Sequence, residues 1–291
     1  MNILIAGGKG LVGTELKSFL TRHGHDVFVL SRSSSNQAEK TWHWNPSKNE
    51  IDPKALVGQD VIINLAGARI LPKPWTKKRR KELVSSRVGS TEFLVSEINK
   101  VDKEPSHYIQ ISAIGYYGNR ESELLTEDSG VGKGFLPELC EAWEKAGSNL
   151  NAEVKNHILR LGLYMHKDGG YYPINALLAK FKLLTNFGNG KQYLAFTHKD
   201  QLNGVLLKLM SGELDPNTYN VVAKSAYRSR EFVKLMGGPS WLPNIPGFLL
   251  KLIIKRTSEA FLSSTNVESK YKEVNECDSF DSLEQMIESL H

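Results

Sequence analysis

The sequence predicts an α/β fold: a doubly wound parallel β-sheet flanked by helices, with a smaller C-terminal domain. Three observations predict it. Apolar runs of strand length alternate with longer segments of helical apolar spacing through the first 165 residues. A glycine-rich segment separates the first apolar run from the first helical segment. The chain also has 291 residues, which is more than one minimal domain needs.

The first elements form a strand–helix–strand unit. Residues 1–6 (MNILIA) are an apolar run typical of a buried strand, and residues 11–23 have the apolar spacing of a helix. Gly24 ends that helix, and residues 26–30 (DVFVL) form the next strand. Such a unit pairs its strands in parallel through a right-handed crossover, so the sheet is expected to be parallel.

The same alternation continues along the chain. Residues 33–55 are polar and rich in turn residues, and Trp42 and Trp44 alternate within them as in a short edge strand. The first domain is therefore expected to span residues 1–165. Its further elements are expected as strands at residues 60–65, 107–112 and 154–161 and helices at residues 76–100 and 135–149.

The regular alternation loosens after residue 165. A helix is expected at residues 173–184, a strand at residues 219–222, and an apolar helix after the glycine- and proline-rich segment 237–247. We place the smaller substrate domain at residues 166–291. Segments at about residues 190–225 are expected to return to the first domain.

Composition bounds the class of protein. Hydrophobic residues make up 40% of the chain, which is enough for a sizeable core. The formal net charge of +5 suits an anionic ligand such as a nucleotide, but it is too small to indicate a nucleic-acid partner.

The cysteines and the apolar runs bear on the compartment. Cys140 and Cys277 are far apart and lack metal-ligand spacing, so neither a disulfide framework nor a metal site is expected. The first apolar run leads directly into glycines, unlike a signal peptide, and the run at 248–254 is short and interrupted by Lys251. We expect a soluble cytoplasmic protein with no membrane partner.

The glycine-rich segment predicts a dinucleotide site. Gly7, Gly10 and Gly13 form a G-x-x-G-x-x-G pattern between a strand and a helix. Glycine permits the tight turn, lets the backbone approach a pyrophosphate and lets the helix pack closely, while the first helical residues, Leu11 and Val12, offer free N–H groups. A structural turn is the alternative. The position inside a strand–helix–strand unit favours a Rossmann-type cofactor site.

The end of the second strand predicts which cofactor binds. A site that prefers NAD carries an acidic residue here for the ribose 2′-hydroxyl, whereas residues 29–35 contain none. They contain Ser31 and Arg32, and Lys9 in the glycine loop adds a positive charge. A guanidinium pairs with a 2′-phosphate, so we expect NADP(H); the alternative is a solvated arginine in a loop.

Two motifs resemble a known family. Residues 6–13 (AGGKGLVG) and 64–67 (NLAG) are similar to extended short-chain dehydrogenases/reductases of the NAD-dependent epimerase/dehydratase class. The resemblance runs from residue 1 to about residue 235, and it implies that Leu65, Ala66 and Gly67 line the cofactor site. Three stretches further resemble the atypical epimerase-family (sugar-nucleotide-epimerase-like) subfamily, which has its own C-terminal domain: residues 74–87, 111–118 and 135–144.

The catalytic residues of the class are only partly present. The class uses a serine, a tyrosine and a lysine four residues after the tyrosine. The resemblance places Ser112 at the serine, but Leu136 and Cys140 at the tyrosine and the lysine. Tyr116 and Tyr117 then remain as candidate proton donors beside the expected nicotinamide. The alternative is that these tyrosines only pack against the sheet or line the pocket.

A basic helix start points to an anionic substrate. Five cations at residues 77–81 follow Thr76, a good N-cap, although positive charge in a first turn opposes the helix dipole. In the resembled subfamily this segment borders the active-site cleft, and Arg87 stands where the class has asparagine. Trp75, Arg79 and Arg87 are therefore candidate contacts for an acidic or phosphorylated substrate. A solvated helix face is the alternative.

Two functions stay open. The first is an NADP(H)-dependent oxidoreductase or epimerase-like enzyme acting on a small, anionic or sugar-like substrate. The second is a non-catalytic NADP(H)-binding protein that senses redox state or serves as a scaffold, because the tyrosine–lysine pair is replaced. A role as an assembly or cell-division interaction protein has no supporting surface motif. A homodimer is compatible with the resemblance.

Overall fold

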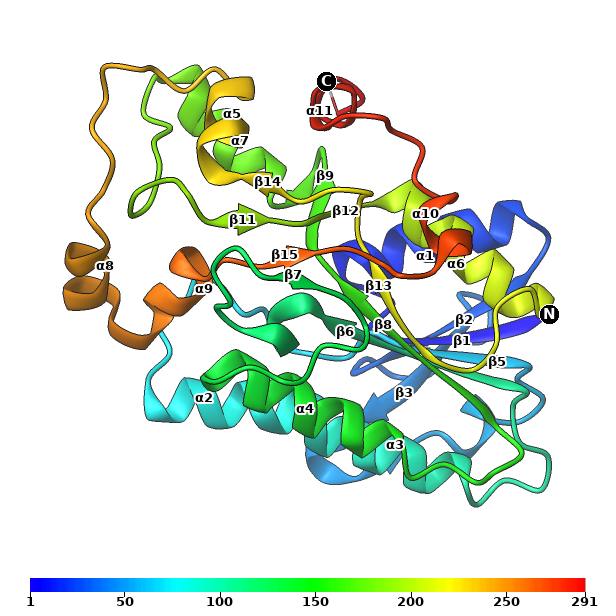
Figure 1. Ribbon diagram of the computed structural model, residues 1–291. Coiled ribbons are helices and arrows are strands. Elements are labelled where there is room, and N and C mark those ends of the chain that lie inside the picture. Colours follow the sequence, from blue (N-terminus) through cyan, green and yellow to red (C-terminus); the bar gives the residue numbers. More distant parts are fainter. Residues whose placement is uncertain (291) are drawn as a thin grey trace. The chain divides into compact units, whose positions relative to one another are not determined.

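The computed structural model describes residues 1–290, and a parallel sheet lies at its centre (Figure 1). The strand order is β13-β8-β6-β5-β1-β2-β3-β4. This confirms the α/β class with a large, mainly parallel sheet. The strands span Asn2–Ala6 (β1), Asp26–Ser31 (β2), Thr41–Asn45 (β3), Glu50–Ile51 (β4), Val61–Asn64 (β5), His107–Ala113 (β6), Lys155–Leu161 (β8) and Thr218–Val221 (β13).

The pairing around β1 determines where a ligand can bind. β1 pairs in parallel with β2 on one side and with β5 on the other. The chain therefore moves outward from β1 through β2 and β3, and then returns to the opposite side of β1. In open parallel sheets such a reversal opens a crevice at the carboxyl ends of the strands.

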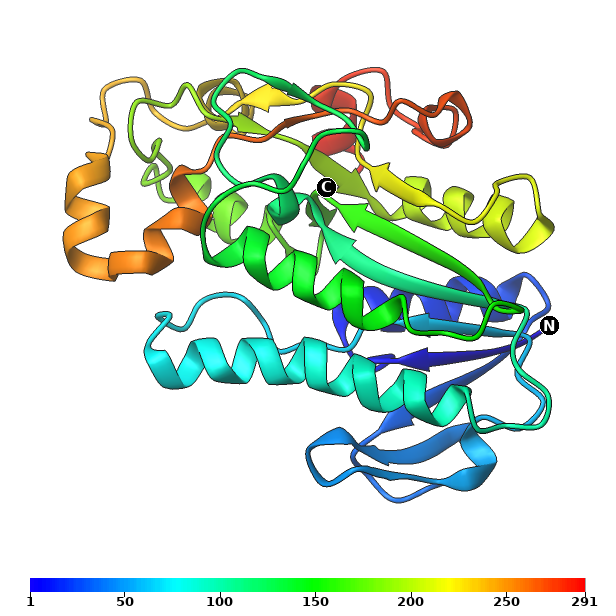
Figure 2. The same cartoon turned by 60° about the horizontal axis from the view of Figure 1, so that its bottom comes forward.

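Helices cover both faces of this sheet. Figures 1 and 2 show α3 and α4 along one face and α1 along the other. The helix expected at residues 76–100 spans residues 77–98 and contains a π-helical turn. The bounds are Leu11–Arg22 (α1), Lys77–Val84 (α2), Ser85–Gly89 (the π-helical turn η3), Ser90–Ile98 (α3) and Phe135–Gly147 (α4).

The core follows from burial on both faces of the sheet. Residues 3–6 of β1 and 61–63 of β5 are apolar and completely buried, as expected for strands covered by helices on both sides. Leu16 and Leu20 of α1 are 1% and 0% exposed. The central strands are thereby fixed, and their carboxyl ends give a rigid base for a site.

Contacts divide the chain into two compact units that are interleaved in sequence. Unit 1 comprises residues 1–112, 139–159 and 206–218. Unit 2 comprises residues 113–138 and 160–205 and the chain from Tyr219 onward. The chain thus first enters unit 2 at Ala113, well before the expected boundary at residue 165, and a later segment returns to unit 1.

Unit 2 is built from short elements around an aromatic core. Phe196 packs against Phe232 and Tyr171, with ring centroids 5.4 and 5.9 Å apart. Its small sheets have the orders β10-β9-β12, β11-β14 and β15-β7. The strands span Leu124–Leu125 (β7), Leu163–His166 (β9), Gly169–Gly170 (β10), Tyr193–Leu194 (β11), Phe196–His198 (β12), Tyr227–Arg228 (β14) and Asn266–Val267 (β15).

The remaining helices follow after β10. None of the helices in the described part of the chain is both long and apolar enough to cross a membrane. Their bounds are Tyr172–Lys180 (α5), Lys199–Ser211 (α6), Ser229–Leu235 (α7), Gly247–Ile254 (α8), Glu259–Leu262 (α9), Lys272–Asn275 (α10) and Leu283–Glu288 (α11).

Candidate cofactor and active site

A cavity of about 1540 Å³ lies in unit 1 at the carboxyl ends of β1, β2 and β5. Further lining comes from η3 and α3. Leu11, Val12 and Gly13 do not line it, because they form the first turn of α1 behind the loop. Seven of the residues expected at the cofactor do line it: Gly7, Gly10, Ser31, Arg32, Leu65, Ala66 and Gly67.

The glycine loop packs against the segment that follows β5. Gly7 has a φ of +83°, and a Cβ on it would lie 2.9 Å from the carbonyl of Leu65. A Cβ on Gly13 would lie 2.6 Å from the Gly7 oxygen and from Gly8 Cα. Only glycine fits at both positions, and α1 therefore starts directly against the loop. Its first N–H groups have no partner within the helix and suit a phosphate.

The end of β2 carries positive charge. Lys9 Nζ donates to Ser33 Oγ at 3.1 Å, and the Ser31 and Ser33 hydroxyls lie 2.9 Å apart. Arg32 is exposed and lines the cavity beside them. Two cations and two hydroxyls therefore lie together at the end of β2, an arrangement that suits an anionic group.

A buried amide fixes the turn after β5. Asn64 Nδ2 donates to Thr91 Oγ1 at 2.9 Å and to Tyr108 Oη at 2.8 Å. Its Oδ1 accepts from the N–H of Ala66 at 3.0 Å. Trp143 Nε1 donates to the same Thr91 hydroxyl at 3.0 Å. The wall of the cavity at residues 65–67 is thereby tied to α3 and α4.

The next three residues, 68–70, are held by side chains that come later in the chain, just before α2 and within the helical segment that α2 begins. Trp75 is 5% exposed, and its Nε1 donates to the carbonyl of Ile70 at 3.0 Å. Arg79 is 8% exposed and donates through Nη2 to the carbonyl of Arg69. Both side chains, expected at a substrate, thus hold backbone in this structure; their contact with a substrate stays a prediction.

Arg87 completes this set of donors. Its Nη1 donates to the carbonyl of Ala68 at 2.9 Å, and its guanidinium lies 5.1 Å from the Trp143 ring centroid. A Cβ on Gly67 would lie 2.9 Å from Arg87 Cζ, so the guanidinium packs directly behind the cavity wall. Burial lowers the pKa of Arg87 to about 10, although the nearby Cys140 acts in the opposite direction.

Ser112 lies at the end of β6 and is only 3% exposed. Its hydroxyl donates to Glu144 Oε1 at 2.6 Å, and Glu144 itself is 7% exposed. Cys140, on the same helix as Glu144, is buried, and Leu136 is half-buried. The serine expected in the class thus has a carboxylate partner. Neither a phenol nor an ammonium stands on α4 at the two positions where the class has them.

The two adjacent tyrosines lie in unit 2, on a short 3₁₀ turn at Ile114–Tyr117. Tyr117 is completely buried; its hydroxyl donates to Asn220 Oδ1 at 2.7 Å and accepts from Arg160 Nη1 at 2.9 Å. Burial raises the pKa of Tyr117, and the charge of Arg160 opposes that rise. Tyr116 is half-buried, with Arg160 Cζ 3.5 Å from its ring centroid.

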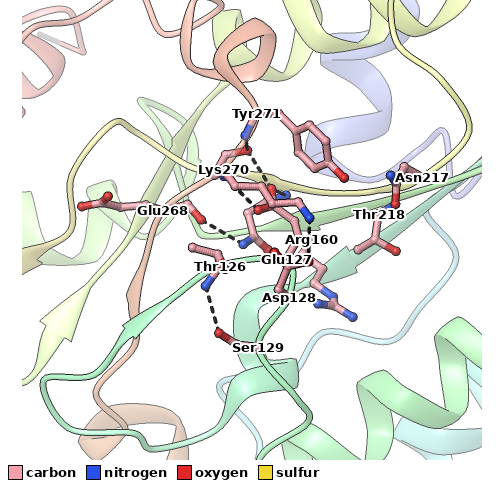
Figure 3. Close-up of polar contacts among 12 residues, drawn as sticks. Thr126, Glu127, Asp128, Ser129, Arg160, Asn217, Thr218, Glu268, Lys270 and Tyr271 are labelled. Atoms are coloured by element: carbon pink, nitrogen blue, oxygen red, sulfur yellow. Dashed lines mark hydrogen bonds and ion pairs between the residues drawn. The ribbon is translucent and has the colours of Figure 1, made fainter.

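Sequence reasoning missed the carboxylate that supports this cluster. Figure 3 shows Glu127, on the loop at residues 126–129, beside the segment at residues 268–271. It accepts hydrogen bonds from three donors: the Asn220 N–H at 2.8 Å, Ser269 Oγ at 2.7 Å and the Lys270 N–H at 2.9 Å. The partners are distant in sequence, so no local pattern marks them.

No group of three or more histidine, cysteine or acidic side chains within residues 1–290 is placed to hold a metal ion. The arrangement in unit 1 is instead that of a nucleotide site: a glycine loop, a helix start and two cations around one cavity.

Comparison with known proteins identifies the family. Residues 3–221 match the model of the NAD dependent epimerase/dehydratase family. "Epimerase family protein YfhF" of Bacillus subtilis (strain 168) is 31% identical over 258 residues, covering 86% of this chain and 84% of that protein. The human epimerase family protein SDR39U1 is 28% identical over 240 residues, covering 81% and 80%.

Solved structures share the fold. The crystal structure of human epimerase family protein SDR39U1 (isoform 2) with NADPH has a TM-score of 0.86 at 22% identity, covering 100% of this chain and 99% of that one. UDP-glucuronic acid 4-epimerase from Bacillus cereus, with UDP-glucuronic acid and NAD, has a TM-score of 0.70 at 17% identity, covering 99% and 97%. With the family match over most of its length, the chain belongs to the NAD-dependent epimerase/dehydratase family.

Proposed function

We propose that the protein binds NADP(H) in the cavity of unit 1 and acts as an oxidoreductase or epimerase-like enzyme on a small, anionic or sugar-like substrate. The observation that carries the cofactor is the pair of cations, Lys9 and Arg32, beside the hydroxyls at the end of β2. Relatives support it: SDR39U1 was solved with NADPH, and the Bacillus cereus epimerase with a sugar nucleotide and NAD.

The residues of the cavity fit a dinucleotide. The glycine loop has no room for a Cβ at Gly7 or Gly13, so its backbone can approach a pyrophosphate at the start of α1. Ser31, Arg32 and Lys9 would hold the 2′-phosphate, and residues 65–67 would line the ribose side. When bound, the nicotinamide supplies or accepts a hydride.

We assign different roles to the two tyrosines. Tyr116 is the proton donor, because the hydroxyl of Tyr117 is already engaged with Asn220 and Arg160, whereas Tyr116 contacts Arg160 only through its ring. Tyr117 positions the Arg160 guanidinium through its buried hydroxyl. Ser112, whose proton is donated to Glu144, would accept a hydrogen bond from a substrate hydroxyl. Arg87, Trp75 and Arg79 remain candidate contacts for the anionic group of the substrate.

Binding without turnover is the second candidate function. The observation that favours it is the chemistry of α4, where a half-buried leucine, Leu136, and a buried cysteine, Cys140, occupy the positions of the tyrosine and lysine of the class. A cofactor-binding scaffold or redox sensor requires neither residue.

Calorimetric titration with NADPH and NADH tests the cofactor. The wild-type protein should prefer NADPH, and Arg32→Ala should weaken NADPH binding roughly 10- to 100-fold while leaving NADH unchanged. Arg22→Ala, an exposed arginine at the end of α1 outside the cavity, is the matched control and should bind as wild type. If neither NADPH nor NADH bound, the proposal would be wrong.

A further inference from the structure

Helix α8 exposes most of its apolar side chains. Phe248 is 69% exposed, and Leu252 and Ile253 are each 72% exposed. None of the residues of α8 is buried. Single exposed apolar residues are ordinary, but successive turns of one helix that are apolar and exposed form a contiguous patch that marks an interaction surface. In Figures 1 and 2 the helix lies at the margin of unit 2.

The exposed residues share one side of the helix. Phe248 and Leu252 are four residues apart, as are Leu249 and Ile253, so the two pairs lie next to each other over consecutive turns. Leu250 and Ile254, on the opposite side, are half-buried. The wider apolar face of the helix is thus exposed, and the side with Leu250 and Ile254 is the more buried one.

Cations border this apolar face. A pocket of about 590 Å³ next to α8 is lined by Lys251, Lys255 and Arg256 together with Ser258 and Ser263. All three cations are exposed, and none forms an ion pair within the part of the chain that the structure describes.

The carboxylate in this pocket is already used. Glu259 accepts from the backbone N–H groups of Phe135 at 3.3 Å and Leu136 at 3.1 Å, where it serves the start of α4. It is therefore directed at the helix start and does not neutralise the lysines and the arginine. The Ser258 and Ser263 hydroxyls also donate to backbone carbonyls, those of Lys255 and Glu259. The pocket therefore keeps an excess of positive charge, carried by its three cations, which suits a phosphate group.

We propose that α8 binds the surface of an anionic membrane, with Phe248, Leu252 and Ile253 in the acyl boundary and Lys251, Lys255 and Arg256 at lipid phosphates. An apolar face bordered by cations is the pattern of helices that lie in a membrane interface, where stable binding takes both signals. This proposal does not depend on the proposed function.

Two features favour a lipid over a second copy of the chain. A two-fold contact through this face brings the same patch of both copies together, and the three cations of each copy would then face those of the other. An anionic lipid surface instead offers apolar and negative groups side by side. The expectation of no membrane partner concerned spanning segments, whereas a helix of eight residues can bind a membrane by lying in its interface.

Cosedimentation of the full chain with vesicles tests the proposal. Binding is expected to vesicles of phosphatidylcholine mixed with phosphatidylglycerol, to weaken at high salt, and to be absent with phosphatidylcholine alone. Leu252→Gln/Ile253→Gln should reduce binding at least about ten-fold because the apolar anchor is lost. Ile174→Gln/Leu177→Gln, an apolar pair on α5 that is 56% and 51% exposed, is the matched control and should bind as wild type.

A second set of variants separates local charge from net charge. Replacing the three cations of the pocket by glutamine should reduce binding on the order of 100-fold, since each basic residue near the surface contributes roughly five-fold. The control removes three exposed lysines of α2 and should have little effect: Lys77→Gln, Lys78→Gln and Lys81→Gln.

Thermal unfolding and NADPH titration of every variant check that the fold and the cavity of unit 1 are intact. Equal binding by the wild type and both α8 variants would overturn the proposal, and so would no binding to anionic vesicles. A dimer in solution that Leu252→Gln/Ile253→Gln converts to monomer would also overturn it, because the face would then belong to a second copy.

Discussion

Tyr116 and Tyr117 are neighbours in sequence, yet only one of them has a hydroxyl free of the buried network around Asn220 and Arg160. The Tyr117 hydroxyl both donates and accepts inside unit 2, while Tyr116 contributes its ring to the same guanidinium. Sequence alone could name the pair but could not separate them, because the partners that distinguish them lie 43 and 103 residues away.

The two tyrosines should therefore respond differently to removal of the hydroxyl. Once a substrate is found by screening carbonyl compounds for NADPH oxidation, Tyr116→Phe should lower kcat roughly 100-fold or more and leave NADPH binding unchanged. Tyr117→Phe should lower the free energy of unfolding by about 1–3 kcal/mol, because two buried partners lose a hydrogen bond. Denaturant unfolding and steady-state kinetics measure both. Full activity in Tyr116→Phe would remove it as proton donor.

Arg87 offers a test between holding the loop and binding a substrate. If its main role is the hydrogen bond to the Ala68 carbonyl, Arg87→Lys should weaken NADPH binding about ten-fold, because the cavity wall is released. If it contacts the substrate anion, KM should rise with NADPH affinity unchanged. Lys81→Gln, an exposed cation of α2, is the control for charge and should change neither.

At the scale of elements, the path α2–η3–α3 differs most from the expectation. The apolar spacing at residues 76–100 predicts one continuous helix, and the structure inserts a π-helical turn at Ser85–Gly89. Within this turn Ser86 Oγ accepts from the N–H of Ala68 at 3.0 Å, and Arg87 Nη1 donates to the carbonyl of the same Ala68. A widened turn thus lets consecutive side chains reach the same residue, and such turns are frequent at functional sites.

The glycine loop is the element that sequence predicts best, and its glycines can be tested individually. Gly13→Ala places a Cβ 2.6 Å from backbone atoms that cannot move away, so it should lower the free energy of unfolding by about 1–3 kcal/mol and weaken NADPH binding. Gly89→Ala is the helical control: nothing lies within 4 Å of its Cβ, and it should be neutral or stabilise by up to about 1 kcal/mol. Chemical unfolding compares them.

For the whole molecule, the buried histidine pair of β6 and β8 links stability to pH. His107 Nδ1 lies 3.0 Å from His157 Nε2, and both residues belong to unit 1. Burial, followed by the charge of His107, lowers the pKa of His157 from 6.5 to about 4. Above pH 6.5, His157 is neutral in both the folded and the unfolded chain. Below pH 6.5, His157 takes up a proton in the unfolded chain but not in the folded one.

Stability should therefore fall as the pH drops from 6.5 towards 4, by at most about 3 kcal/mol from this site. Urea unfolding at successive pH values measures the slope. His157→Gln should flatten it, whereas His23→Gln, an exposed histidine of unit 1, should leave it as in wild type. An unchanged slope in His157→Gln would assign the pH dependence to other groups.

Local patterns account for the strands, the helices and the cofactor loop, because hydrophobic period and glycine spacing are both encoded over short stretches. The remaining contacts of the site are long-range. The donors that hold residues 68–70 and the donors around Glu127 belong to ordinary residues whose partners are determined by the tertiary fold. No spacing in the sequence distinguishes them from surface residues.

The interleaving of the two units has a consequence for how the protein is made. Unit 1 is incomplete until residue 218 has left the ribosome, because its last segment is residues 206–218. The first segment of unit 2, which begins at Ala113, is synthesised before that. Neither unit is encoded by one contiguous stretch of sequence. A fragment that ends at residue 165 should therefore not unfold cooperatively. For the same reason, a single genetic crossover cannot exchange either unit between relatives. We therefore expect the two units to fold only when the whole chain has been made, and to be inherited together.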